Sequence, residues 1–322
     1  MCTKNLIQVH DIIKNERFFA NTKSYTEAKE FFKSKRYSVL KLPCGQCLEC
    51  RMEYSKTWAF RCMQETKEHE DNIMMTLTYN EENVPHGTKI DKETGECSAS
   101  LTLEHKDVQD FIKRLRKNTG QKFKYYMCGE YGEKFERPHY HIIFFGLKID
   151  DMEPYKKKTS EYGTHLLYKS KICDKTWRKG FVDLNEVNYE TCAYVARYVT
   201  KKQKGHLTKE IYELRGQKPE YTQMSKGIGK KYFYDNIEKI KNKEDLYVKT
   251  GKGVKVGKPG RYYDKLLEQE DPKRLKEIKK NRIKRSAEIL EQILSQTPLN
   301  EVEYQEQKDY ITRVRSKNLK RC

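Results

Sequence analysis

The sequence has no long apolar run and little that would mark it for export. No stretch of its 322 residues approaches the roughly 18 uninterrupted apolar residues that a membrane-spanning helix needs. The first residues carry no hydrophobic block followed by small residues, which is the pattern of a secretory signal. These absences predict a protein with no membrane association and exclude the secreted class.

Acidic residues are in short supply, because 47 Asp and Glu oppose 66 Lys and Arg and leave a net charge of +19. Disordered chains are poor in aromatic residues, whereas this chain is 11% aromatic with 23 tyrosines, so a wholly unfolded protein is excluded. The charge favours a polyanionic partner, and the aromatic rings favour single-stranded nucleic acid, whose bases stack on them. The alternative is a basic protein whose charge serves no partner.

The ten cysteines do not form the pattern of a small disulfide-bonded scaffold, because most stand singly in apolar or helical stretches. The exception is Cys44-x-x-Cys47-x-x-Cys50, whose spacing is typical of a zinc site. Cys2 or Cys62 is the candidate fourth thiolate. The alternative is a group of three small reduced cysteines at a turn and helix start.

Hydrophobic periodicity predicts an α+β fold with a central antiparallel sheet flanked by helices. The expected elements are a helix at 54–70, a strand at 73–79, a loop at 80–100, a helix at 103–117 that begins after Thr102 and ends at Gly120, strands at 123–129 and 139–146, a short strand at 181–184 and a helix at 188–202. From Asp264 to Cys322, charged sequence with sparse apolar positions predicts helices that pack on another element or stay partly solvated.

The segment from Arg137 to Gly146 is the most informative in the chain. Side chains alternate between the two faces of a strand, so His139 and His141 point the same way. The rest of both faces is apolar, which predicts an interior strand, where a buried imidazole without a partner costs about 1–3 kcal/mol. A shared Mg²⁺ or Mn²⁺ would satisfy both rings. Glu130 at the end of the preceding strand is the candidate third ligand, and open positions remain for water and a phosphate oxygen.

Two alternatives to this metal site stay open. The histidines of a His-x-His strand can be core residues satisfied by ordinary hydrogen bonds. Glu133 and Glu136 are rival acids, although as turn residues we expect them to be solvated.

A second pattern lies in the helix expected at 188–202, where Tyr194, Tyr198 and Lys201 share one face. Its core face is a separate stripe at helical spacing formed by Cys192, Val195, Ala196 and Val199. Two phenols one turn apart can act in succession as nucleophiles on a metal-bound phosphate, with a lysine balancing its charge. A free phenol has a pKa of about 10, so this chemistry needs a nearby cation. The alternative is a pair of amphipathic tyrosines at the edge of a core.

Three segments in order resemble the motifs of the HUH endonucleases that initiate rolling-circle replication. They are Thr76-Leu77-Thr78-Tyr79, Pro138-His139-Tyr140-His141 and Tyr194-x-x-x-Tyr198. Cys128-Gly129-Glu130-Tyr131-Gly132, Tyr194-Val195-Ala196-Arg197-Tyr198-Val199 and the N-terminal Cys44-Gly45-Gln46-Cys47 narrow the resemblance to the replication initiators of gokushovirus-type microviruses, which are small single-stranded DNA phages. The motif-bearing match covers residues 70–205.

The resemblance implies an RRM-like sheet on which His139, His141 and Glu130 bind the catalytic cation. It also implies that Tyr194 and Tyr198 are nucleophiles. One would nick the origin strand, keep its 5′ phosphate and leave a 3′ hydroxyl primer, and the other would cut the completed genome for strand joining. Relatives tend to carry Lys between the two tyrosines. Arg197 cannot act as a proton donor, so we assign that role to Lys201 or Lys202.

The same resemblance suggests three segments and a setting. Residues 1–70 form a cysteine-containing segment, 71–205 the catalytic domain, and 206–322 a basic, mainly helical region that includes a glycine-basic stretch, Ser225–Lys231, expected as a loop that meets DNA backbone or as plain surface. The partners would be single-stranded origin DNA and the host polymerase and helicase, in the cytoplasm of a bacterial host. The rival functions are a plasmid or transposon HUH nickase and a non-catalytic, zinc-stabilised single-stranded DNA-binding protein.

Overall fold

The computed structural model describes residues 6–21, 25–132, 134–160, 163–197, 208–243, 245–250 and 253–317. The chain forms two compact units, one of Ser55–Tyr263 and one of Met1–Tyr54 with Asp264–Cys322. These bounds differ from the three consecutive segments expected from the sequence. The N- and C-terminal parts fold together, and the sheet of the larger unit takes in a strand from beyond residue 205.

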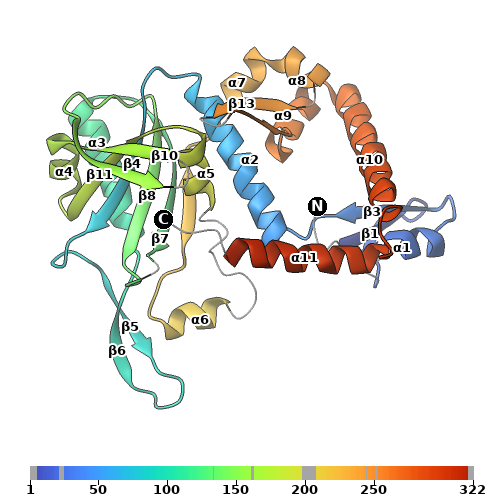
Figure 1. Cartoon of the computed structure of the whole chain (residues 1–322), viewed down its shortest axis with the longest axis horizontal. Helices are drawn as coiled ribbons and strands as arrows, with labels where there is room; N and C mark the ends of the chain where they lie inside the picture. Colours follow the sequence, from blue (N-terminus) through green and yellow to red (C-terminus); the bar gives the residue numbers. More distant parts are fainter. Residues whose placement is uncertain are drawn as a thin grey trace. The chain divides into compact units, whose positions relative to one another are not determined.

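The larger unit is built on a seven-stranded sheet in which every pairing is antiparallel (Figure 1). In spatial order its strands are β12 (Tyr221–Met224), β7 (Lys124–Tyr131), β8 (Pro138–Phe145), β4 (Asn72–Tyr79), β11 (Gly180–Glu186), β10 (Gly163–Lys169) and β9 (Glu153–Ser160). The expected α+β class with a central antiparallel sheet is confirmed. The histidine-bearing β8 is an interior strand, as its apolar flanks predict.

One face of this sheet is covered by α3 (His105–Thr119) and α4 (Lys171–Trp177) (Figure 1). Leu77, Tyr140 and Phe144 from the sheet pack there with Phe111 and Trp177 from the two helices, and all are buried. This face carries the larger unit's main hydrophobic core and holds the central strands in register.

The cap of α3 differs from the expectation. Its N-cap residue is Glu104, whose side chain accepts a bond from the backbone N–H of Lys106, whereas the Thr102 hydroxyl accepts from the backbone N–H of Lys218 at 2.9 Å. Thr102 is therefore used to fix a distant loop. The other end matches the prediction, because Gly120 closes the helix in the left-handed conformation with φ of 67°.

The opposite face of the sheet carries α5 (Tyr189–Arg197) and the second half of α2 (Leu48–Thr66). Trp58 of α2 stacks on Tyr126 of β7 with ring centroids 4.8 Å apart. In α5 the predicted core stripe is confirmed for the three of its members that are described, since Cys192, Val195 and Ala196 are fully buried. Val199 lies outside the described residues. The helix expected at 54–70 begins earlier, at Leu48, and ends at Thr66.

The expectation of a loop at 80–100 is wrong, because a hairpin of β5 (His86–Ile90) and β6 (Cys97–Leu101) forms there. Its strands are largely exposed on both sides, so no apolar alternation marks them in the sequence. The C-terminal region is also less purely helical than expected. Besides β12 it contains α6 (Thr208–Leu214), α7 (Lys230–Asp235), α8 (Ile237–Lys243), the hairpin β13 (Leu246–Thr250) with β14 (Gly253–Gly257), and α9 (Arg261–Glu270).

The smaller unit combines a three-stranded sheet with helices from both ends of the chain. The sheet has the order β2 (Glu16–Phe19), β1 (Leu6–Asp11), β3 (Tyr37–Leu42), and the helices are α1 (Tyr25–Phe31), α10 (Pro272–Leu294) and α11 (Glu301–Lys317). The hydroxyl of Thr26 donates to Glu301 at 2.9 Å, which joins the two ends. The hydrogen bonds from Arg36 hold the pKa of Asp11 down at about 2.

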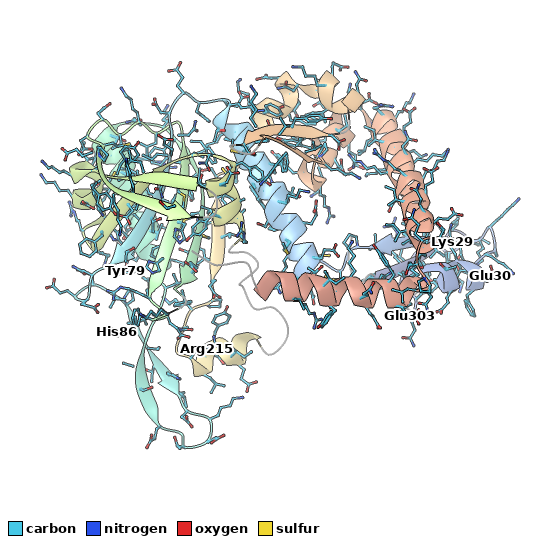
Figure 2. All side chains as sticks on the ribbon, viewed as in Figure 1. Lys29, Glu30, Tyr79, His86, Arg215 and Glu303 are labelled. Carbon is cyan, nitrogen blue, oxygen red and sulfur yellow. The ribbon has the colours of Figure 1, made fainter. Side chains whose placement is uncertain are left out.

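The charged terminal helices behave as their composition predicts. In α10 the side chains of Leu275 and Ile278 are buried, whereas Ile289 is 43% exposed. Lys29 on α1 and Glu303 on α11 are exposed to solvent (Figure 2). None of the described helices is both long enough and apolar enough to cross a bilayer.

A buried carboxylate ties α2 to the sheet and to the glycine-basic stretch. Glu65 is 1% exposed and accepts bonds from Nζ of Lys124 at 2.7 Å and from the backbone N–H of Gly229 at 2.6 Å, with Nε2 of His69 at 3.0 Å. The Gly229 N–H is thereby occupied, and the neighbouring Ile228 is fully buried. The idea that this backbone wraps a phosphate is therefore wrong, and the stretch is a packed junction with exposed lysines.

Glu65→Gln is expected to lower the free energy of unfolding by about 2 kcal/mol at neutral pH, because it leaves buried donors poorly satisfied. Burial alone raises the pKa of Glu65, but its donors, led by Lys124 and His69, outweigh this and bring the pKa below the ordinary 4.5. A lowered folded-state pKa gives stability that is complete at neutral pH and is lost as the pH falls below 4.5. Urea unfolding of wild type and variant at pH 7 and pH 4 measures the effect.

The gap between the two proteins should narrow at pH 4, and an equal gap at both values would contradict the assignment. Glu238→Gln is the matched control, since that carboxylate lies in the same unit, is 75% exposed, and pairs only with Lys241 among the described residues. It is expected to leave the unfolding transition unchanged.

Candidate active site on the central sheet

The two histidines of β8 lie on the same face of the sheet, as the alternation predicts. His141 is opposite Thr76 of β4, and His139 is flanked by Thr78 of β4 and Glu130 of β7. His141 is only 5% exposed, while His139 is half-buried. The face that carries α5 therefore holds two adjacent imidazoles at the middle of the sheet.

Threonine hydroxyls on β4 hold both imidazole rings. Oγ1 of Thr76 lies 3.0 Å from Nδ1 of His141, and Oγ1 of Thr78 lies 3.2 Å from Nδ1 of His139. A hydrogen bond at Nδ1 fixes the ring orientation and directs Nε2 away from β4. Sequence analysis assigned these threonines no role, although a Thr-x-Thr strand has the same period of two as the His-x-His strand it faces.

Glu130 is the acid that the fold brings to the histidines. It is 3% exposed, and its Oε1 lies 3.3 Å from Nε2 of His141. The rival Glu136 accepts a hydrogen bond from Nε2 of Gln217 at 2.9 Å instead. The other rival, Glu133, lies outside the described residues.

Tyr194 of α5 stands directly over this pair. Its ring meets the His141 ring edge-on, with centroids 5.1 Å apart and planes at 80°. Tyr198 and Lys201, the other two residues predicted on this helix face, lie outside the described residues, as does Lys202. The described part of the site therefore unites one candidate nucleophile, both histidines and the acid, drawn from α5, β8 and β7.

Tyrosines on the far face of the sheet serve the core instead. The hydroxyl of Tyr79 donates to Asp107 at 2.8 Å, and that of Tyr140 donates to the backbone carbonyl of Glu104 at 2.9 Å. Burial raises the pKa of both phenols far above the ordinary value. Neither is suited to act as a nucleophile, which leaves Tyr194 as the described phenol placed for chemistry.

The donor set at the histidines fits a divalent cation in kind. Nε2 of His141 and Oε1 of Glu130 converge, and His139 is the register partner of Glu130, at a position where Cβ atoms lie about 5 Å apart. In the described part of the chain, the only three candidate ligand atoms already within 4.8 Å of one another are the sulfurs of Cys44, Cys47 and Cys50. His139 would thus have to turn toward the pair to share its ion. The three cysteines lie in the other compact unit and form a separate cluster.

Comparison with known proteins identifies the relatives of this chain. Residues 72–203, which include β4, β7, β8 and α5, match the family model of the replication-associated protein ORF2. Replication-associated protein ORF2 of Spiroplasma virus 4 is 35% identical over 272 residues, covering 82% of this chain and 79% of the relative.

Two further relatives share shorter parts of the chain. Replication-associated protein ORF4 of Chlamydia phage 1 is 30% identical over 233 residues, which are 70% of this chain and 53% of the relative. Replication-associated protein VP4 of Bdellovibrio phage phiMH2K is 32% identical over 177 residues, which are 52% and 51% of the two chains. No solved structure matches the fold.

Proposed function

The chain belongs to the replication-associated proteins of gokushovirus-type phages, the replication initiators of these viruses, and from that premise we propose that it nicks and rejoins single-stranded origin DNA in rolling-circle replication. The observation that carries the proposal is the placement of the Tyr194 ring against His141, whose Nε2 meets the buried Glu130. A phenol, imidazoles and a carboxylate on one sheet face are the parts that an HUH-type nuclease requires.

In this proposal the Tyr194 hydroxyl attacks the phosphorus of a DNA phosphodiester. The new O–P bond forms as the bond to the 3′ oxygen breaks, so the 5′ phosphate stays on the tyrosine and the departing strand takes up a proton as a 3′ hydroxyl. Tyr198 would repeat the attack on the completed strand, and the released 3′ hydroxyl would then reverse the first step and close the circle.

The remaining side chains orient the site and balance its charge. Thr76 and Thr78 hold the two imidazoles in one orientation, and Lys201 would face the charge of the phosphate. His139, His141 and Glu130 would hold a cation such as Mg²⁺ or Mn²⁺, which would polarise the phosphate and favour the phenolate.

The setting follows from the product and from the charge. A free 3′ hydroxyl is a primer, so the host polymerase would extend it while a host helicase parts the strands, in the bacterial cytoplasm. The net charge of +19 suits the polyanionic backbone of the single strand.

The test uses the full chain, Mn²⁺ and overlapping single-stranded fragments of the cognate phage genome labelled at the 3′ end. We expect one fragment to give a labelled protein band that survives denaturation, and mass spectrometry to find the DNA on the peptide that carries Tyr194 or Tyr198. EDTA should abolish the band. The absence of any adduct, its persistence in EDTA, or attachment elsewhere would each overturn the proposal.

A further inference from the structure

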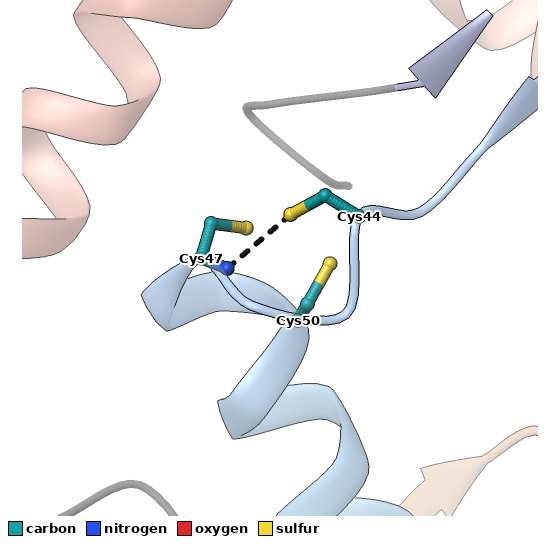
Figure 3. A group of neighbouring side chains, drawn as sticks. All are labelled: Cys44, Cys47 and Cys50. Atoms are coloured by element: carbon teal, nitrogen blue, oxygen red, sulfur yellow. Dashed lines mark hydrogen bonds between the residues drawn. The ribbon is translucent and has the colours of Figure 1, made fainter. Parts of the chain in front are cut away.

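We propose that Cys44, Cys47 and Cys50 bind a structural Zn²⁺ where the chain passes from β3 into α2. The three sulfur atoms lie within 4.8 Å of one another and turn toward a common space (Figure 3). Sulfurs that share a tetrahedral zinc at about 2.3 Å stand about 3.8 Å apart, so the cluster needs only a small contraction to bind the ion. This site lies outside the catalytic machinery and does not depend on the proposed nicking activity.

The turn at Cys44 prepares its sulfur for a metal. The backbone N–H groups of Gln46 and Cys47 donate to Sγ of Cys44 at 3.4 and 3.2 Å. Gly45 permits this turn because its φ is +69°, in the left-handed region, with open space where a side chain would stand. Two amide dipoles aimed at one sulfur favour its negative form, which is the form that binds zinc.

The other two sulfurs gain from the start of α2. The carbonyl of Cys47 accepts from the backbone N–H of Arg51 at 3.1 Å, so Cys47 stands just before the helix, and Cys50 lies in its first turn. The N-terminal end of a 19-residue helix carries partial positive charge, which favours thiolates at these positions. All three cysteines therefore have neighbouring donors or dipoles that offset negative charge.

The candidate fourth ligands from the sequence are reduced by the fold. Cys62 is on the same helix but about 18 Å along the axis from Cys50, so its assignment to the cluster is wrong. Cys62 is fully buried and lies against Cys192 in the larger unit, where burial raises the pKa of Cys192. Cys2 lies outside the described residues.

Zinc in this position would fix the junction between β3 and α2 in a unit whose sheet has only three strands. Small sheets have little core, and a metal that binds only the folded form adds stability to them. We therefore assign the ion a structural role, separate from the cation of the active site.

The experiment measures zinc in full-length protein purified without chelators. We expect about one zinc per chain that is released to a chelating dye by a mercurial reagent, and nearly none in Cys47→Ser or Cys50→Ser. Cys97→Ser is the control, because that thiol is exposed on the β5–β6 hairpin, and it should keep the zinc.

A second measurement does not require the serine variants to fold. Wild-type protein with Co²⁺ in place of zinc should show strong thiolate-to-metal absorption and the visible bands of a tetrahedral ion. A chain without zinc or such absorption, zinc content unchanged in both serine variants, or a native Cys44–Cys47 disulfide would overturn the proposal. Each of these readouts is independent of whether the protein nicks DNA.

Discussion

The double variant Tyr194→Phe/Tyr198→Phe is expected to give no denaturation-resistant protein–DNA product at any time point. Phenylalanine keeps the ring that meets His141 at 5.1 Å but lacks the oxygen that would form the bond to phosphorus. Binding of single-stranded DNA should stay within about threefold of wild type, because backbone charge dominates that affinity. Adduct gels and fluorescence anisotropy on the same DNA fragment separate the two effects.

A matched control for this variant is Tyr247→Phe. That phenol is 49% exposed on β13 in the same compact unit, and its loss should change neither adduct nor binding. If the double variant still formed an adduct, another side chain would be the nucleophile, and the assignment of α5 as the catalytic helix would be wrong.

His141→Ala is expected to slow cleavage about a thousandfold, the loss typical when a group that stabilises charge in the reaction is removed. His141 is the best-placed ligand of the set, because it contacts Glu130 and Tyr194 at once. Thr76→Val should act more mildly, by about tenfold to a hundredfold, since it removes only the hydroxyl that orients the ring. Initial rates of adduct formation across a Mn²⁺ titration measure both.

The Mn²⁺ dependence distinguishes a positioning role from a general loss of structure. Thr76→Val should require more Mn²⁺ for half-maximal rate, whereas Thr88→Val, an exposed threonine on the β5–β6 hairpin, should match wild type. Rates for His141→Ala within about threefold of wild type would rule out the histidine as a ligand. Thermal unfolding of each variant checks that the sheet is intact.

The candidate site was open to prediction from sequence wherever short-range geometry decides the outcome. The period of two in a strand places His139 and His141 on one face, and the short connection from Tyr131 to Pro138 brings Glu130 beside them. The stripe of Cys192, Val195 and Ala196 likewise follows from helical spacing alone. These are local rules, and they hold without knowledge of the rest of the fold.

Long-range pairing was beyond the same reasoning. Strand β12 has four residues and no alternation of burial, and it joins β7 through contacts made far along the chain. Tyr221 stacks on His105 with ring centroids 3.5 Å apart, and the Ser225 hydroxyl accepts from the backbone N–H of Tyr125. The Thr76 and Thr78 contacts also depend on which strand neighbours β8, a fact that only the assembled sheet supplies.

The indole of Trp177 connects the hidden side of the sheet to the reactive side. Its Nε1–H donates to the backbone carbonyl of Thr78 at 3.1 Å, and the hydroxyl of that same threonine lies against His139. A survey of substitutions scored by phage yield would therefore mark this fully enclosed residue as indispensable, although no nucleotide ever reaches it. Tolerance maps of such proteins need a folding readout before intolerant positions are taken for contact points.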